Sequence, residues 1–510
     1  MNKTKLIKST GTISIATALS RVLGFVRDIV IANFFGTAIY AQAFVVAFRI
    51  PNLLRDLIGE GATNAAFVPV LTDELTKNGK DEFFKLAQVI LNILFLVLIA
   101  LTVIGIFASP IIVKLIAPGF SANAEKFEAT VTLTRILFPF LIMVGLWAYA
   151  MGVLNSLGVF AAPAFGPCLV NISMILCAMW FGENVFGLAS GVLAGGALQL
   201  FIQFPSLYKH GWKPRLTAEF SHPKAKRIGK LLVPRALGAC VYQVNVFIST
   251  ILASLSGIVG EGAVAAIYYA NRVWQLPLAI FGIALAQAAL PAMSRHVALN
   301  DMGKLKETVL FSLRVLFFIL IPSSIGLMVM GTPITKVLFE RGAFTAYSTQ
   351  ITASALFFYA IGLVACGGIK VLVSAFYAMH DTMTPVKTAF CALIMNIILN
   401  LALMYPLKVG GLALATSISA IFNFIALYIL LRKRLGDFGI KQTIDSFLKV
   451  TLASLVMAGA LEAALLYINR VTPLSLLGII GAGIVIFLAV SHLLKVDELK
   501  EMLVWIKRKR

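Results

Sequence analysis

The stretch VILNILFLVLIALTVIGIF, residues 89–107, decides the class of fold. It contains no charged side chain, and about 20 apolar residues in a helix cross the ~30 Å hydrocarbon core of a bilayer. Similar runs recur along the chain, and 60% of all residues are hydrophobic while only 13% are charged. The sequence therefore predicts an all-α polytopic membrane protein. Closed β-barrels are excluded, because their short spans alternate in period two.

Runs of this kind predict about fourteen transmembrane helices. The predicted spans are 9–35, 41–71, 84–116, 127–157, 161–181, 186–207, 229–257, 262–297, 304–339, 348–378, 384–405, 409–433, 445–468 and 473–494.

The net charge of +21 is distributed unevenly along the chain. Lys and Arg gather near the start, in 209–230, in 432–441 and in 507–510, and the intervening loops carry few. The positive-inside rule places the basic loops and both termini in the cytoplasm, which requires an even number of spans. A positive net charge can also indicate binding of nucleic acid. The sequence has no aromatic-basic nucleic-acid motif, so the positive-inside rule is the better explanation of the charge. The N-terminal segment is interpreted as a retained cytoplasmic tail.

The five cysteines predict neither a disulfide framework nor a metal site. They lie within apolar spans, and the sequence has no CxxC motif and no Cys/His cluster. No cofactor is expected.

An internal repeat relates the two halves of the chain. Arg49 and Arg272 are 223 residues apart, and the same spacing separates two prolines and two glycines, Pro110 from Pro333 and Gly119 from Gly342. The repeat predicts two six-helix lobes as parallel repeats about an axis along the membrane normal, an arrangement known from transporters. The predicted parts are an N-lobe at 1–208, a basic cytoplasmic linker at 209–228, a C-lobe at 229–433, and two further spans with a cytoplasmic tail at 434–510.

Charged residues inside several spans indicate where function lies. In the first span Ser20, Gly24, Arg27 and Asp28 form one polar face, with Arg21 one turn earlier. Arg27 and Asp28 are adjacent, so the sequence suggests that neither is the other's main partner. Other polar residues lie in later spans: Arg49, Asn52, Arg55, Asp56, Glu60, Thr63, Asn271, Arg272, Gln275, Gln287, Lys370, Ser374, Tyr377 and, at the end of its span, Asp381.

These intramembrane charges are more often basic than acidic. Arg binds phosphate bidentately and stays protonated, so the set favours a cavity for a phosphate-bearing substrate. Structural pairing of Arg55 with Asp56 or Glu60 remains an alternative. Arg21 and Arg55 could instead extend to the cytoplasmic interface.

Four motifs resemble the MurJ (MviN) family, the lipid II flippases of peptidoglycan synthesis. They are SRVLGFVRD at 20–28, FRIPNLLRDLIGEGATNAAFVPVL at 48–71, YYANR at 268–272 and FYAMHDTMTPVK at 376–387. The resemblance implies the multidrug/oligosaccharidyl-lipid/polysaccharide exporter fold, with a cavity between two lobes and a groove for the polyprenyl tail beside the last two spans. It implies that the substrate-binding residues are Arg21, Arg27, Asp28, Asn52, Arg55, Arg272 and Lys370.

The resemblance implies a flippase in the bacterial cytoplasmic membrane. Its substrate would be undecaprenyl-diphosphate-linked disaccharide-pentapeptide, carried from the inner to the outer leaflet by alternating access. Membrane lipids and the cell-wall synthesis machinery are the partners considered. Two departures leave coupling to ions or membrane potential open, because many family members have carboxylates where this chain has Gln42 and Gln275.

Two other classes of function were weighed against the flippase. One is an exporter of another polyprenyl-diphosphate-linked oligosaccharide or of a cationic drug, although a drug exporter should have an acidic cavity. The other is a membrane enzyme using Asp56 and Glu60, which lacks a large extracellular loop to house an acceptor. The basic tail at 496–510 is expected either to lie on the inner leaflet or to be solvated.

Overall fold

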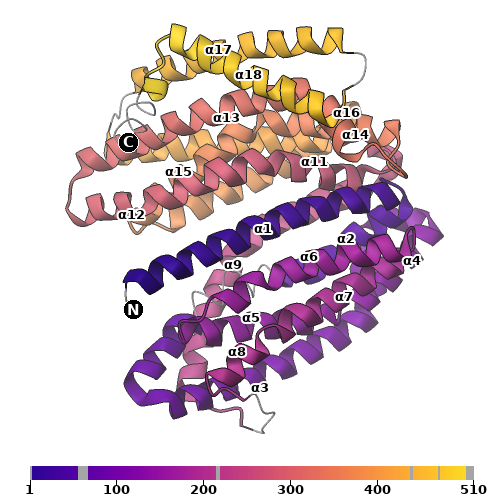
Figure 1. The fold of residues 1–510 in the computed structure, drawn as a ribbon, viewed down its shortest axis with the longest axis vertical. Coiled ribbons are helices and arrows are strands. Elements are labelled where there is room, and N and C mark those ends of the chain that lie inside the picture. The colour runs from indigo at the N-terminus through magenta and orange to yellow at the C-terminus, as the bar shows by residue number, and fades with distance from the viewer. Residues whose placement is uncertain (1–2, 56–66, 214–218, 437–439, 469–470, 501–510) are drawn as a thin grey trace. The chain divides into compact units, whose positions relative to one another are not determined.

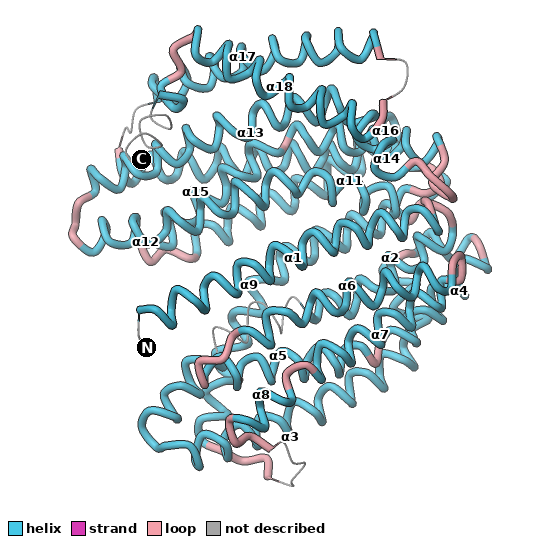
Figure 2. The backbone as a smooth tube through the Cα atoms, viewed as in Figure 1, coloured by secondary structure: helices cyan, strands magenta, loops and turns pink. Residues whose placement is uncertain are grey.

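A computed structural model describes residues 3–55, 67–213, 219–436, 440–468 and 471–500. The residues that it describes form helices and loops and no strand, which confirms the all-α prediction (Figure 2). Contacts between helices divide the chain into two units (Figure 1). The first comprises Met1–Leu255 and Arg341–Phe344, and the second comprises Ser256–Glu340 and Thr345–Arg510.

The first unit contains ten helical elements among the described residues. They are α1 (Lys3–Phe35), α2 (Ile39–Arg55), α3 (Val68–Ile116), η2 (Pro118–Ala122), α4 (Ala124–Leu137), α5 (Phe140–Ser156), α6 (Ala161–Phe181), α7 (Val185–Phe201), α8 (Phe204–Lys209) and α9 (Pro223–Ala253). Gly79, with φ 83°, interrupts α3, so its first turns and its long apolar part are separate helices.

The second unit contains the remaining helices. They are α10 (Ser256–Val259), α11 (Ala263–Pro277), the π-helix η3 (Leu278–Ile283), α12 (Ala284–Ala298), α13 (Met302–Phe339), α14 (Ala346–Ile361), α15 (Leu363–Ala378), α16 (Met383–Leu435), α17 (Ile440–Tyr467) and α18 (Pro473–Leu493). Non-helical backbone at Lys408 divides α16 into two segments.

Within the described residues, nine helices are long and apolar enough to cross a membrane, or ten if the bent pair of α14 and α15 counts as one span. The chain is therefore a multi-pass membrane protein. The count of fourteen stays a prediction. Charged helices such as α1 are not apolar enough to be assigned as spans by composition, and residues 56–66 lie outside the described part. The lobe boundaries drawn from the repeat also stay a prediction.

The bend between α14 and α15 has a local cause that the sequence pattern did not predict. The two helices meet at 44° where a single span was expected. The Ser417 hydroxyl of α16 donates to the Phe358 carbonyl at 2.6 Å, and a side chain at Gly362 would collide with Ser417. A side chain inserted into the carbonyl ladder is a recognised cause of helix bending.

The helix α9 begins earlier than the sequence suggested, inside the predicted linker 209–228. His222 accepts the Lys224 backbone N–H with its side chain, and Pro223 occupies the first helical turn. Lys224 then pairs with Asp73 at 3.2 Å and with the buried Glu74, both on α3. Trp212 stacks on Phe84 of α3, with ring centroids 5.6 Å apart. Both the start of α9 and Trp212 are thus held against α3.

In the second unit, Asp381 holds the turn before α16. Its carboxylate accepts the Met383 and Thr384 backbone N–H groups at 3.0 Å and pairs with Arg434 at 2.6 Å. The Thr384 hydroxyl and backbone N–H donate to Asp381 and are the main reason that the pKa of this carboxyl lies below its ordinary value. Arg432, Lys433 and Arg434 end α16 beside this turn. In the first unit, Lys224, Lys226 and Arg227 lie in the first turns of α9. We refer to the end of each unit that carries these residues as its basic end.

We expect Asp381→Asn to lower the stability of the purified protein by about 1 kcal/mol at pH 7, the usual contribution of a helix cap. Because the pKa of Asp381 is lower in the folded protein than in the unfolded chain, the ionised carboxylate stabilises the fold at pH values above the unfolded pKa near 3.9. This stabilisation is lost as the pH falls through the pKa of the folded state. Thermal unfolding of both proteins at pH 7 and pH 3 measures this. The difference between them should shrink at pH 3; a constant difference would contradict the ionic role of Asp381.

Candidate functional site

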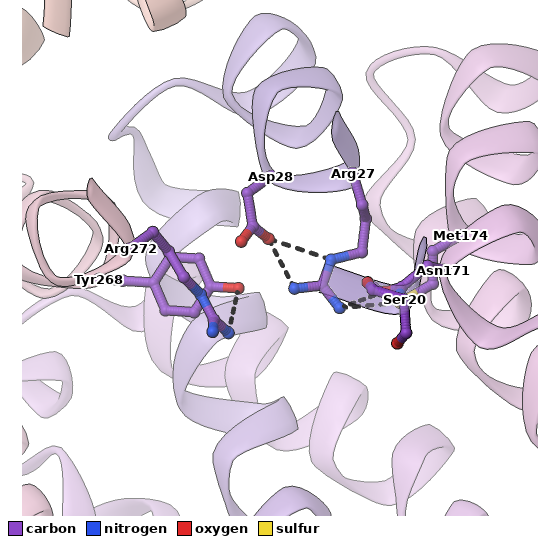
Figure 3. A network of polar contacts seen from close by, with 7 residues as sticks. All are labelled: Ser20, Arg27, Asp28, Asn171, Met174, Tyr268 and Arg272. Carbon is purple, nitrogen blue, oxygen red and sulfur yellow. Dashed lines mark hydrogen bonds and ion pairs between the residues drawn. The ribbon is translucent and has the colours of Figure 1, made fainter. Parts of the chain in front are cut away.

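Arg27 of α1 lies at the centre of a buried polar network in the first unit (Figure 3). Its guanidinium donates to the Asp28 carboxylate at 2.7 and 3.0 Å. It also donates to the Asn171 side-chain oxygen of α6 at 3.0 Å. The Asn171 amide donates in turn to the Ser20 carbonyl at 3.1 Å. Asp28 is 1% exposed and Arg27 is 8% exposed, so this charged pair is removed from solvent.

This network corrects the expectation that Arg27 and Asp28 do not pair. Adjacent side chains leave a helix about 100° apart, but the long flexible Arg side chain carries its guanidinium back to the neighbouring carboxylate. The polar face is also less open than the spacing suggested. Gly24 lies beside the Asn171 side chain, so the face formed by Ser20, Gly24 and Arg27 packs against α6.

Arg21 lies on the same helix in a different environment. It is exposed, and its side chain has no hydrogen bond or ion pair with the described residues. Val22 beside it is 61% exposed. Arg21 is therefore a cation that no carboxylate of the described chain neutralises.

Only part of the predicted stripe on α2 can be placed. The side chain of Arg55 and residues 56–66, which include Asp56, Glu60 and Thr63, lie outside the described residues. Arg49 donates to the Val246 carbonyl of α9 at 3.3 Å, a structural contact. The Asn52 side-chain oxygen is buried and has no hydrogen-bond partner among the residues that the structure describes. A buried acceptor without a donor is costly, and a ligand N–H or O–H would satisfy it.

In the second unit, Arg272 of α11 lies over the ring of Tyr268 (Figure 3). Its guanidinium carbon is 4.8 Å from the ring centroid, and it donates to the Tyr268 hydroxyl at 3.2 Å. The cation–π contact and the hydrogen bond orient a half-buried guanidinium. The side-chain oxygen of the preceding Asn271 is also buried, and within the described part of the chain it has no hydrogen-bond partner.

Lys370 of α15 is exposed, and its side chain has no hydrogen bond or ion pair with the described residues. On the same helix, the Ser374 hydroxyl donates to the Lys370 carbonyl at 3.0 Å. Together with Arg21, Lys370 offers positive charge that the described carboxylates leave uncompensated. Such cations can bind an anionic ligand.

The two glutamines at which the family resemblance leads us to expect carboxylates differ in burial. Gln42 is 2% exposed and donates to the Thr37 carbonyl at 3.2 Å, so a neutral amide completes a turn there. Gln275 is half-buried on α11, about one turn from Arg272. The amide of Gln275 is neutral. Unlike a carboxylate at the same position, it does not offset the positive charge of Arg272.

Sequence reasoning missed Asn171 and Tyr268, which orient two of the predicted arginines. Asn171 stands in the apolar segment PCLVNISM, and its polarity in such a span was the available signal. Tyr268 lies four residues before Arg272, the spacing that places two side chains on one helical face.

One cluster of metal-type donors occurs among the residues that the structure describes. Glu74, Glu82 and His222 have side-chain atoms within 4.8 Å of one another. Lys224 already pairs with Glu74, and the Nδ1 of His222 accepts the Lys224 backbone N–H. A metal-bound His instead donates its second ring N–H. The contacts therefore describe an ion-pair network that fixes the start of α9.

Comparisons with known proteins converge on one family. A family profile described as "Lipid II flippase MurJ" matches residues 31–482. The "Lipid II flippase MurJ" of Burkholderia cenocepacia is 35% identical over 500 residues, covering 95% of this chain and 96% of the relative. The "Probable lipid II flippase MurJ" of Vibrio cholerae is also 35% identical and covers 96% of this chain and 97% of its own length.

Solved structures give the same fold. A structure titled "Lipid II flippase MurJ, inward closed conformation" superimposes with a TM-score of 0.81 at 28% identity, covering 95% of this chain and 99% of that one. An inward-facing multidrug transporter of the MATE family and MOP superfamily reaches a TM-score of 0.69 at 15% identity, covering 83% of this chain and 98% of that one. At that identity the likeness shows the fold alone.

Proposed function

The chain belongs to the lipid II flippase MurJ family, and on this premise we propose that it moves lipid II across the bacterial cytoplasmic membrane. The head group would pass from the inner to the outer leaflet while the polyprenyl tail stays in the bilayer. The single observation that carries the proposal is the match over residues 31–482, with 35% identity to a full-length relative. The basic end of each unit and both termini would face the cytoplasm.

The polar residues on α1, α11 and α15 support a role in holding the head group. Arg21 and Lys370 carry positive charge that no described carboxylate neutralises, and Arg272 is oriented by Tyr268. Guanidinium and ammonium groups are the side chains that bind a diphosphate. The buried acceptors of Asn52 and Asn271 suit the amide and hydroxyl donors of a sugar-peptide head group.

Arg27 and Asp28 take a different part in this proposal. The Arg27 guanidinium already contacts Asp28 and Asn171, so a phosphate must share or displace those contacts to bind it. We assign Asp28 and Asn171 to positioning Arg27. Arg55 keeps its proposed substrate-binding role from the family resemblance, since its side chain lies outside the described residues.

Transport would proceed by alternating access, as a shift between two conformations that substrate contacts bias. The family consists of flippases, which move a lipid and form no new bond, so the enzyme hypothesis has no support. The relatives described above name lipid II and no other lipid-linked oligosaccharide. The cell-wall synthesis machinery is the partner that this function requires downstream.

The test is rescue of a bacterium depleted of its own lipid II flippase. Wild type should restore growth, whereas Arg21→Ala, Arg272→Ala and Lys370→Ala should each weaken transport roughly tenfold or more, because each removes a charge-assisted contact of about 1.5–3 kcal/mol. Arg295→Ala is the matched control, an exposed arginine at the basic end with no assigned role. Immunoblots of membranes must show equal amounts of each protein.

The outcomes separate the proposals. Rescue by wild type and control but not by the three variants supports both the function and the site. Full rescue by all three variants would contradict the site and leave the function. Failure of well-expressed wild type to rescue would contradict lipid II as the substrate.

A further inference from the structure

A cavity of about 450 Å³ lies between α13 and α14, outside the site described above. Its lining residues belong to the last turns of α13 and the first turns of α14. Its lining includes Met328, Thr332, Lys336, Glu340, Gln350 and Phe357. All of these belong to the second unit.

The lining changes from apolar to polar along the helix axes. On α13, Met328 comes first, followed by Thr332 and Lys336, and Glu340 caps the helix end. Lys336 lies eight residues after Met328, a rise of about 12 Å along the helix. On α14 the order is mirrored, because Gln350 lies near the start of the helix and Phe357 lies two turns deeper. The apolar end therefore points toward the membrane interior and the polar end toward its surface.

The polar end carries one positive and one negative charge, which form a loose ion pair. The Lys336 ammonium is 3.8 Å from one Glu340 oxygen, beyond hydrogen-bonding distance. The other Glu340 oxygen accepts the Thr349 hydroxyl at 2.6 Å, which fixes the carboxylate. The Lys336 side chain is 62% exposed. Exposed pairs of this kind interact weakly, so both charges remain available to a ligand.

We propose that this cavity binds a zwitterionic phospholipid whose head group carries a phosphate and a primary ammonium, the phosphatidylethanolamine class. Lys336 would bind the phosphate, Glu340 would bind the ammonium, and the acyl chains would leave along Met328 and Phe357. If the basic ends face the cytoplasm, as proposed above, the polar end of the cavity lies toward the outer surface of the membrane. A lipid of the outer leaflet likewise has its polar head group at that surface and its apolar chains toward the membrane interior. The neutral charge pair disfavours a purely anionic head group such as a diphosphate or phosphatidylglycerol, because Glu340 would repel it.

Native mass spectrometry of the delipidated full-length protein tests the proposal. We expect wild type to retain phosphatidylethanolamine over phosphatidylglycerol, and Lys336→Gln and Glu340→Gln each to bind phosphatidylethanolamine about tenfold more weakly, through loss of one charge-assisted contact. Lys114→Gln is the matched control, because Lys114 is the exposed lysine in the last turn of α3 and does not line this cavity.

Three results would overturn the proposal. They are unchanged phosphatidylethanolamine binding by both cavity variants, equal binding of phosphatidylglycerol, and displacement of phosphatidylethanolamine by undecaprenyl diphosphate in wild type but not in the variants. The last would make the cavity a site for the transported lipid. The assay measures binding without transport, so Arg272→Ala should bind phosphatidylethanolamine normally even if it fails to rescue growth.

Discussion

The Asp28→Ala variant is expected to lose about 3–5 kcal/mol of stability, because it leaves the Arg27 guanidinium buried without its counter-charge. The Arg27 side chain is 10% exposed and that of Asp28 is 1% exposed, and their closest atoms are 2.7 Å apart. Arg27→Ala should cost a similar amount by leaving the Asp28 carboxylate uncompensated. Thermal unfolding of each variant in detergent, beside wild type, measures the loss. Neither variant should rescue a flippase-depleted strain.

A double variant separates folding from function. Arg27→Met keeps the length of the side chain, and Asp28→Leu keeps the branched shape of the carboxylate. Replacing both partners of a buried pair by apolar groups of like shape is often neutral or stabilising. We therefore expect the double variant to recover most of the lost stability and still fail to rescue growth, because the substrate would lose the Arg27 guanidinium. Growth at wild-type rates would restrict the pair to a structural role.

A milder substitution provides the control for this pair. Asp28→Asn keeps an oxygen that can accept from Arg27 but removes the charge. Its loss of stability should lie between wild type and Asp28→Ala. If Asp28→Asn instead matches Asp28→Ala, the carboxylate charge and not the hydrogen bond fixes Arg27.

The class of fold was predictable because it depends on composition alone. A run such as 89–107 must be buried in lipid or protein, and its backbone must then be hydrogen-bonded within a helix. The same argument identified the unusual charges of α1, since charged side chains are rare in a span unless a partner or function retains them. Such reasoning locates polar residues along the chain but not the side chains that they contact.

The partners of those residues depend on contacts between distant segments. Arg27 meets Asn171, which is 144 residues away, and no spacing rule connects the two. The bend at Gly362 likewise depends on Ser417 from α16. The pairing of Arg27 with Asp28 was wrongly excluded because helical geometry fixes the direction of Cβ and not the position of a guanidinium several bonds away.

Among small single substitutions, we expect the largest effect on transport at two glycines, Gly119 and Gly342. A side chain at Gly119 would overlap the Ser254 carbonyl at the end of α9, and the Gly119 N–H bonds the Ser254 hydroxyl at 3.1 Å. A side chain at Gly342 would overlap the Asn33 carbonyl near the end of α1, and the adjacent Ala343 N–H donates to that carbonyl at 2.8 Å. Both contacts lie in the first unit, at the end opposite to its basic end.

These contacts leave no room for adjustment, because the obstructing atoms belong to backbone. Gly342 also has φ 55°, which side-chain-bearing residues rarely adopt. The two glycines are 223 residues apart, the spacing of the internal repeat, and each packs on the end of a helix in the same way. We therefore expect Gly119→Val and Gly342→Val to prevent these two close approaches and to lower lipid II transport at least tenfold.

The measurement is rescue of growth together with flipping by the purified protein in vesicles. Gly257→Val is the matched control, because a Cβ added at Gly257 would meet no atom of a neighbouring segment within 4 Å, and Gly257 lies three residues after Ser254. The variants must reach the membrane in wild-type amounts, so that loss of transport reflects a lost conformation and not a lost protein. Normal transport by Gly119→Val would contradict the expectation, since the protein would then complete its cycle without the close approach of Gly119 to Ser254.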